Sequence, residues 1–94
     1  MKIAKLEVRF LLHGCRSLKE KRQRLGKLRD KFGRMPGLAV CESGYPDDLR
    51  QSEWSFAACA GSGMVVEQTL AEVERYVAQS IDAEVTSFSR QWLA

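Results

Sequence analysis

The chain of 94 residues has no long apolar run, a single histidine and only three cysteines. A membrane span needs roughly 18 consecutive apolar residues, and no segment approaches that length. Residues 1–7 alternate charged and apolar side chains, whereas a signal peptide has an uninterrupted apolar segment. We therefore expect a cytoplasmic protein with no membrane partner.

The cysteines are too few and too dispersed for a disulfide framework or a zinc site. Cys15, Cys41 and Cys59 are odd in number, and no two are close in the sequence. Zinc sites gather several Cys and His ligands, and here only His13 lies near a cysteine. We expect no metal and no other cofactor. We interpret Cys41 and Cys59 as small apolar side chains in strands.

Strict alternation over residues 3–13 predicts a strand with one buried face. The apolar face consists of Ala4, Leu6, Val8, Phe10 and Leu12. The opposite face consists of Lys5, Glu7, Arg9, Leu11 and His13. Gly14 ends the strand. Ser17 is suited to cap a following helix, because its hydroxyl can accept a hydrogen bond from a free amide of the first turn.

Two helices and three further strands are predicted after Ser17. The first helix has an apolar stripe made of Leu18, Leu25, Leu28 and Phe32, and Gly33 and Pro36-Gly37 end it. Alternation over residues 53–60 predicts a strand with Trp54 and Phe56 in the core. Residues 38–43 are a short strand candidate, and residues 83–92 favour a fourth strand with a less regular pattern. The second helix begins after Gly61-Ser62-Gly63, and its stripe is Val66, Leu70, Val73 and Val77.

The predicted order is strand, helix, strand, strand, helix, strand. Two such halves form a ferredoxin-like sandwich, an α+β fold in which both helices cover one face of a four-stranded antiparallel sheet. No linker divides the chain, so we expect a single domain over residues 1–94. This fold places the first and third strands in the middle and leaves the other sheet face open to solvent.

The hexapeptide Ser17-Leu18-Lys19-Glu20-Lys21-Arg22 is the most distinctive motif. Together with Val40-Cys41-Glu42, Asp48-Leu49 and Val66-Glu67-Gln68-Thr69-Leu70, it resembles the YlxP-like bacterial family, a domain of unknown function. That family is similar to small ferredoxin-like proteins and is often encoded beside translation-initiation and ribosome-maturation factors. The resemblance implies a role near RNA or the ribosome, and it supplies no catalytic residues.

Positive charge is concentrated in residues 16–34. This segment holds nine of the fifteen Lys and Arg residues but only two acidic residues, a local charge of +7. Several of these cations occupy the first turns of the predicted helix, where the helix dipole disfavours them. An external anion would neutralise them, and phosphate is a common one. The alternative is a solvated face that keeps the protein soluble.

We predict a non-enzymatic protein that associates with RNA or the ribosome through this helix. The predicted phosphate contacts are Arg16, Lys19, Lys21, Arg22, Lys27 and Arg29. Lys21 differs from the others because it falls on the apolar side of the helix. In the interpretation we favour, its ammonium reaches water or a carbonyl at the sheet edge. In the other, it clamps a phosphate or carboxylate.

Two other functions stay open. The chain could be a protein-interaction or homodimer module, with the basic helix on an acidic partner and the last strand pairing edge to edge. Phe88, Arg90 and Trp92 share one face of that strand, but the pattern does not say which face it is. A small enzyme using Cys15 or His13 is a weaker alternative, since no third orienting group is evident. The sequence identifies no small-molecule substrate.

Overall fold

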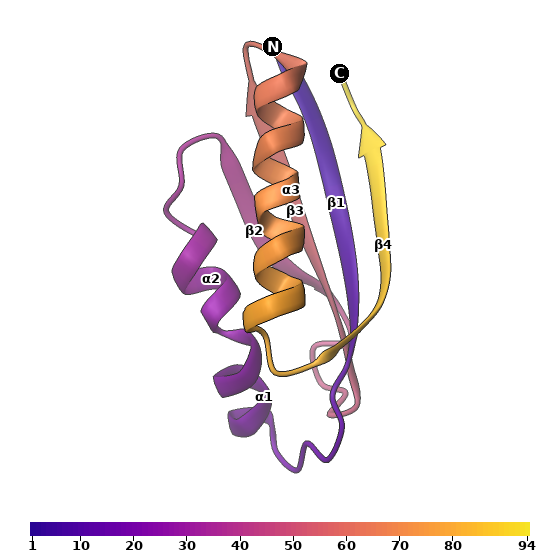
Figure 1. The fold of residues 1–94 in the computed structure, drawn as a ribbon. Helices are drawn as coiled ribbons and strands as arrows, with labels where there is room; N and C mark the ends of the chain where they lie inside the picture. Colours follow the sequence, from indigo (N-terminus) through magenta and orange to yellow (C-terminus); the bar gives the residue numbers. More distant parts are fainter.

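The computed structural model describes residues 1–94 and consists of one antiparallel sheet with helices on one of its faces (Figure 1). The elements are β1 (Lys2–Leu11), α1 (Leu18–Leu25), α2 (Lys27–Phe32), β2 (Leu38–Gly44), β3 (Gln51–Ala60), α3 (Gly63–Ser80) and β4 (Glu84–Trp92). The four strands lie in the order β2-β3-β1-β4, and all neighbours are antiparallel. The first and third strands are therefore central, as the sequence predicts.

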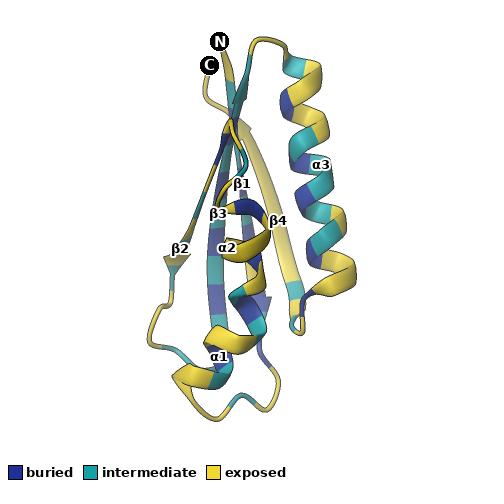
Figure 2. Cartoon of the chain, turned by 90° about the vertical axis from the view of Figure 1, so that its left-hand side faces the viewer, coloured by how far each residue is buried: buried dark blue, intermediate teal, exposed yellow.

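The core lies between the sheet and the helices, which all stand on the same side of the sheet (Figure 2). The apolar positions of β1 and the following Leu12 are buried, which confirms the alternation read from the sequence. Trp54 and Phe56 of β3 are buried on the same face. Phe32 of α2 contacts the Phe56 ring edge to face, with ring centroids 5.9 Å apart. The apolar stripe of α3 completes the core.

The predicted first helix is divided into α1 and α2 at Gly26, which corrects the expectation of one continuous helix. The amide of Gly26 still donates to the carbonyl of Arg22 at 2.7 Å, so the helical bonding continues across the junction. Glycine has no side chain to pack and weakens a helix interior, which allows the axis to change there. Leu18 is another correction: it is 38 % exposed rather than packed in the core.

A serine caps the start of α1, as predicted, and another caps the start of α3. The Ser17 hydroxyl accepts a hydrogen bond from the amide of Glu20 at 3.0 Å. The Ser62 hydroxyl accepts one from the amide of Val65 at 3.2 Å. Each cap satisfies a free amide of the first helical turn and thereby fixes where the helix begins.

The register of β4 settles which face its aromatic residues occupy. Phe88 pairs with Val8 and Trp92 with Ala4, so both side chains project on the helix-covered side of the sheet. The strand lies at the edge, however, and Phe88 and Trp92 remain 41 % and 48 % exposed. Arg90, which lies between them, forms an ion pair with Glu74 of α3.

The other face of the sheet is open and carries no aromatic residue on β1. Lys5 and Glu7 form an ion pair with each other at 2.8 Å, and Arg9 pairs with Glu53 of β3 at 3.1 Å. Cys41 and Cys59 lie in strands, as expected, but on this open face rather than in the core. None of the helices is long and apolar enough to cross a membrane.

Candidate functional site

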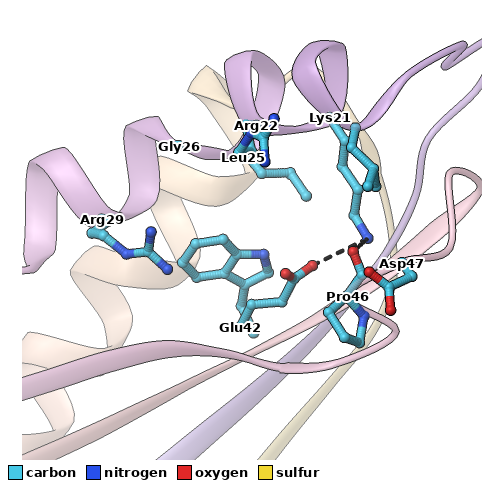
Figure 3. Close-up of a pocket in the computed structure, with 10 residues that line it drawn as sticks. Lys21, Arg22, Leu25, Gly26, Arg29, Glu42, Pro46 and Asp47 are labelled. Carbon is cyan, nitrogen blue, oxygen red and sulfur yellow. Dashed lines mark hydrogen bonds and ion pairs between the residues drawn. The ribbon is translucent and has the colours of Figure 1, made fainter.

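Lys21 is the one buried cation of the chain, and its ammonium lies between α1 and the loop that joins β2 to β3 (Figure 3). The Nζ atom donates to the carbonyl oxygen of Tyr45 at 2.6 Å and to that of Asp48 at 2.7 Å. It also pairs with Glu42 Oε2 at 3.2 Å. The lysine side chain is only 4 % exposed. All of its hydrogen-bonding capacity is therefore used inside the protein.

The partners of Lys21 are themselves held in place. Ser52 donates its hydroxyl proton to Glu42 Oε2 over 2.5 Å. Tyr45 adopts a positive φ of 58°, an uncommon conformation for a residue other than glycine. We call this group the Lys21 cluster; its members are Lys21, Glu42, Ser52 and the carbonyls of Tyr45 and Asp48.

Asp48 organises the loop from its other side. Its carboxylate accepts hydrogen bonds from the backbone amide of Arg50 at 2.8 Å and from the side-chain amide of Gln51 at 3.0 Å. These two hydrogen bonds, followed by the charges of Lys21 and Arg50, hold the pKa of Asp48 below its ordinary value of 3.8. The ionised form of Asp48 is thus the form that the folded loop stabilises.

The structure favours the first interpretation of Lys21 and removes it from the predicted phosphate contacts. Its ammonium reaches carbonyls at the end of the sheet, and a phosphate could bind it only after those bonds were broken. Glu42 and Ser52 were not predicted. Their signal in the sequence is the period of two along a strand. Glu42 lies two residues after Val40, and Ser52 two residues before Trp54, so each shares the buried side of its strand with apolar residues.

Arg24 is a second cation of α1 with internal partners. Its guanidinium donates to the carbonyl of Asp82 at 2.8 Å and to that of His13 at 2.9 Å. It also pairs with Glu20 at 3.4 Å and with the carboxylate of Asp82 at 3.3 Å. Arg24 therefore joins α1 to the segments that follow β1 and α3.

The other five predicted contacts are exposed and have no carboxylate within ion-pairing distance. We call them the basic surface; they are Arg16, Lys19, Arg22, Lys27 and Arg29. Four lie on α1 and α2, and Arg16 precedes α1. The sequence prediction omitted Lys31 and Arg34, which are also exposed on or just after α2. Arg34 makes no ion pair with Asp30.

A cleft of about 340 Å³ lies beside the Lys21 cluster (Figure 3). Its lining comes from α1 and α2, from β2 and β3, and from the loop between these strands. Arg22 and Arg29 of the basic surface line it, and the Arg29 guanidinium lies over the Trp54 ring, 5.5 Å from its centroid. The cleft thus connects the basic surface with the buried polar cluster.

The two residues of the weaker enzymatic alternative have separate partners. His13 lies beyond the end of β1, and its Nε2 is 2.7 Å from Glu84 Oε1. The Cys15 thiol is directed to the carbonyl of Ser17 at 3.5 Å. The structure therefore does not join them into a thiol–imidazole pair.

The sheet, the helices on one face and the cluster at one end of the sheet define a small α+β domain. The sequence model of a family described as "Protein of unknown function (DUF503)" matches residues 3–90, and the chain belongs to this family. A search of the curated proteins found no match. Among solved structures, the chain is similar to the "De novo designed protein Ferredog-Diesel". That likeness has a TM-score of 0.52 and 15% identity, covers 95% of this chain and 83% of the designed one, and concerns the fold alone.

Replacing Lys21 with Met should destabilise the protein by about 3 kcal/mol, because Glu42 and two carbonyls lose their partner. This is the lower end of the range for breaking a buried ion pair, since Glu42 keeps some contact with water. Urea unfolding measures the loss. Lys19→Met, on the exposed side of the same helix, is the matched control and should change stability by no more than about 0.5 kcal/mol. Equal effects of the two changes would contradict the structural role.

Asp48→Asn should make stability less dependent on pH in the acid range. Because the folded pKa of Asp48 lies below 3.8, its contribution is complete above that pH and is lost as the pH falls toward the folded value. Urea midpoints measured from about pH 6 down to about pH 2 should therefore fall less steeply in the variant than in the wild type. Asp47→Asn, which removes a carboxylate that accepts no hydrogen bond, should keep the wild-type slope.

Proposed function

We propose that this protein is a ferredoxin-like, YlxP-like member of its family that binds RNA or the ribosome through the basic surface. The exposed cations would contact phosphates, and such contacts position a protein on RNA without reading its sequence. The proposal includes no catalytic step.

One observation carries the proposal: the cations of residues 16–34 divide into two groups by their partners. Lys21 and Arg24 point inward, and each is paired with acidic groups of the fold. The exposed cations of the basic surface have no such partner. Lys19 lies in the first turn of α1, where the helix dipole disfavours a cation, whereas Glu20 in the same turn and Arg22 in the last turn are placed where the dipole favours their charges. An external polyanion is the partner that this arrangement lacks.

The open face of the sheet supports the same choice of surface. RNA-recognition sheets stack bases on aromatic residues of their central strands. Here the central strand β1 presents Lys5, Glu7 and Arg9 on the open face, and these three already have ion-pair partners. The helical side, rather than the open sheet, is therefore the side we assign to RNA.

Replacing Lys19, Arg22 and Lys27 together with Ala should weaken binding to structured RNA and reduce its dependence on salt. Each phosphate contact contributes roughly 0.7–0.9 to the slope of log affinity against log salt, so the slope should fall by about 2–3. Fluorescence anisotropy with a labelled RNA at several salt concentrations measures both quantities.

The control variant must remove the same charge elsewhere. Lys2, Arg50 and Arg75 are exposed, lie outside the basic surface, and can be replaced together with Ala. This variant should retain most of the wild-type slope. If both triple variants bind RNA equally well, the basic surface is not the interface.

We propose homodimerisation through β4 as a second candidate function, because this edge strand exposes apolar side chains and has no unpaired charge. Phe88 and Trp92 are about half exposed, and the two charged side chains of β4, Glu84 and Arg90, are paired within the chain. An uncovered edge of this kind offers free backbone groups and apolar surface to another strand. Two copies of one strand can pair antiparallel about a two-fold axis.

Light scattering after size-exclusion chromatography tests this second candidate. The wild type should have the mass of two chains, and Phe88→Lys should have the mass of one. Val65→Lys adds the same charge at an exposed apolar residue of α3 and should remain dimeric. A wild type with the mass of one chain at every concentration measured would exclude the dimer.

A further inference from the structure

The cleft beside the Lys21 cluster contains a buried hydrogen-bond donor without an acceptor. The indole Nε1 of Trp54 is buried and has no hydrogen-bond partner in the protein, and the residue is only 4 % exposed. Buried polar groups are almost always paired, so an unpaired indole proton on a residue that lines a cleft calls for an acceptor from outside the chain. Trp54 lines the cleft together with Glu42, Arg22 and Arg29.

The same wall offers a free acceptor. Both contacts of the Glu42 carboxylate, those with Lys21 and Ser52, are made by Oε2. Its Oε1 atom is left available, and the carboxylate cannot turn away without breaking these contacts. A ligand in the cleft would therefore meet an acceptor from Glu42 and a donor from Trp54.

The mouth of the cleft adds positive charge and apolar surface. Arg22 is exposed without an acidic partner, and the Arg29 guanidinium lies over the Trp54 ring. Leu18 lines the cleft and is partly exposed. The volume of about 340 Å³ falls at the lower end of the range of small-molecule sites.

We propose that this cleft binds one unpaired nucleotide, with its base inside and its phosphate on Arg22. Every nucleobase carries a hydrogen-bond donor beside an acceptor on its pairing edge, which matches Glu42 Oε1 and Trp54 Nε1. Proteins that recognise single-stranded RNA take splayed bases in this way, by hydrogen bonds to the base edge and by stacking on guanidinium planes. The inference rests on the proposed RNA function and adds to it a site for an unpaired base.

Two features distinguish a nucleotide from inorganic phosphate as the occupant. The Glu42 carboxylate would repel a phosphate at the inner end of the cleft, whereas it can accept a hydrogen bond from a base. Arg22, which is exposed and has no acidic partner, lies at the mouth of the cleft, where a phosphate would remain in contact with water. The charges therefore orient a nucleotide with its base inward.

Titration of the ¹⁵N-labelled protein with each of the four nucleoside monophosphates tests the site through its two indole resonances. Trp54→Phe and Trp92→Phe assign the resonances. The Trp54 Nε1–H resonance should shift and saturate, while that of Trp92 should not move. Arg22→Ala should weaken nucleotide binding roughly tenfold, since it removes a charge-assisted contact. Arg75→Ala, on α3, should leave it unchanged.

A second measurement separates this site from the basic surface. Trp54→Phe keeps an aromatic ring in the core but removes the donor, and its thermal unfolding confirms that it folds. It should weaken binding to an RNA hairpin with an unpaired loop roughly fivefold and leave binding to a fully paired duplex unchanged.

The outcomes are distinct. If nucleotides do not move the Trp54 resonance and Trp54→Phe does not change the hairpin affinity, the nucleotide site is overturned. An ordered water would then be the partner of the indole. The proposed binding of RNA by the basic surface would be unaffected. An equal shift with inorganic phosphate alone would overturn it in favour of an anion site. If nucleotides shift the Trp54 resonance but the protein binds neither the hairpin nor the duplex, the nucleotide site is supported and the RNA function is excluded.

Discussion

The buried ammonium of Lys21 connects parts of the chain that the sheet does not connect. It brings α1 into contact with the end of β2 through Glu42 and with the following loop through two carbonyls. A buried ion pair adds little net stability over an apolar contact, but the loss of one partner is costly. The cluster therefore acts mainly on geometry, because α1 must hold the ammonium against Glu42 and the two carbonyls. That placement also sets the position of the basic surface and the shape of the cleft.

The Lys21 cluster gives a structural role to three of the sequence segments on which the family resemblance rests. Lys21 belongs to the hexapeptide at the start of α1, Glu42 ends the Val40-Cys41-Glu42 segment, and Asp48 begins the Asp48-Leu49 step. The structure brings all three to one end of the sheet. These segments are thus parts of one polar contact, and the role that we propose for RNA falls on neighbouring residues.

Much of the fold could be predicted from periodicity, whereas the site could be predicted only in part. Residues 3–13 and the stripe of α3 have unambiguous patterns, because each buries one face against a continuous core. The division at Gly26 was not predicted, since a glycine weakens a helix without having to end it. The orientation of Phe88 was also unpredictable, because it depends on the register with β1, some 80 residues away in the chain.

The polar contacts could likewise be predicted from the sequence only where they depend on local residues. The basic surface follows from composition, because a run of cations on a helix is visible locally. The pairing of Lys21 with Glu42 and the unpaired indole of Trp54 depend on how separate elements meet in space. Period two assigns Glu42 to the buried side of β2, but it does not identify the cation that lies there.

The position of β1 has a consequence for synthesis of the chain. β1 precedes the other strands in the chain and becomes a central strand, but its neighbours are residues 51–60 and 84–92. More than half of the chain must therefore emerge before β1 has its first neighbour, and nearly all of it before the second arrives. Sheets built from such distant segments fold slowly, because loop closure must precede the stabilising contacts. The backbone edges of β1 accordingly stay unpaired while most of this domain is synthesised.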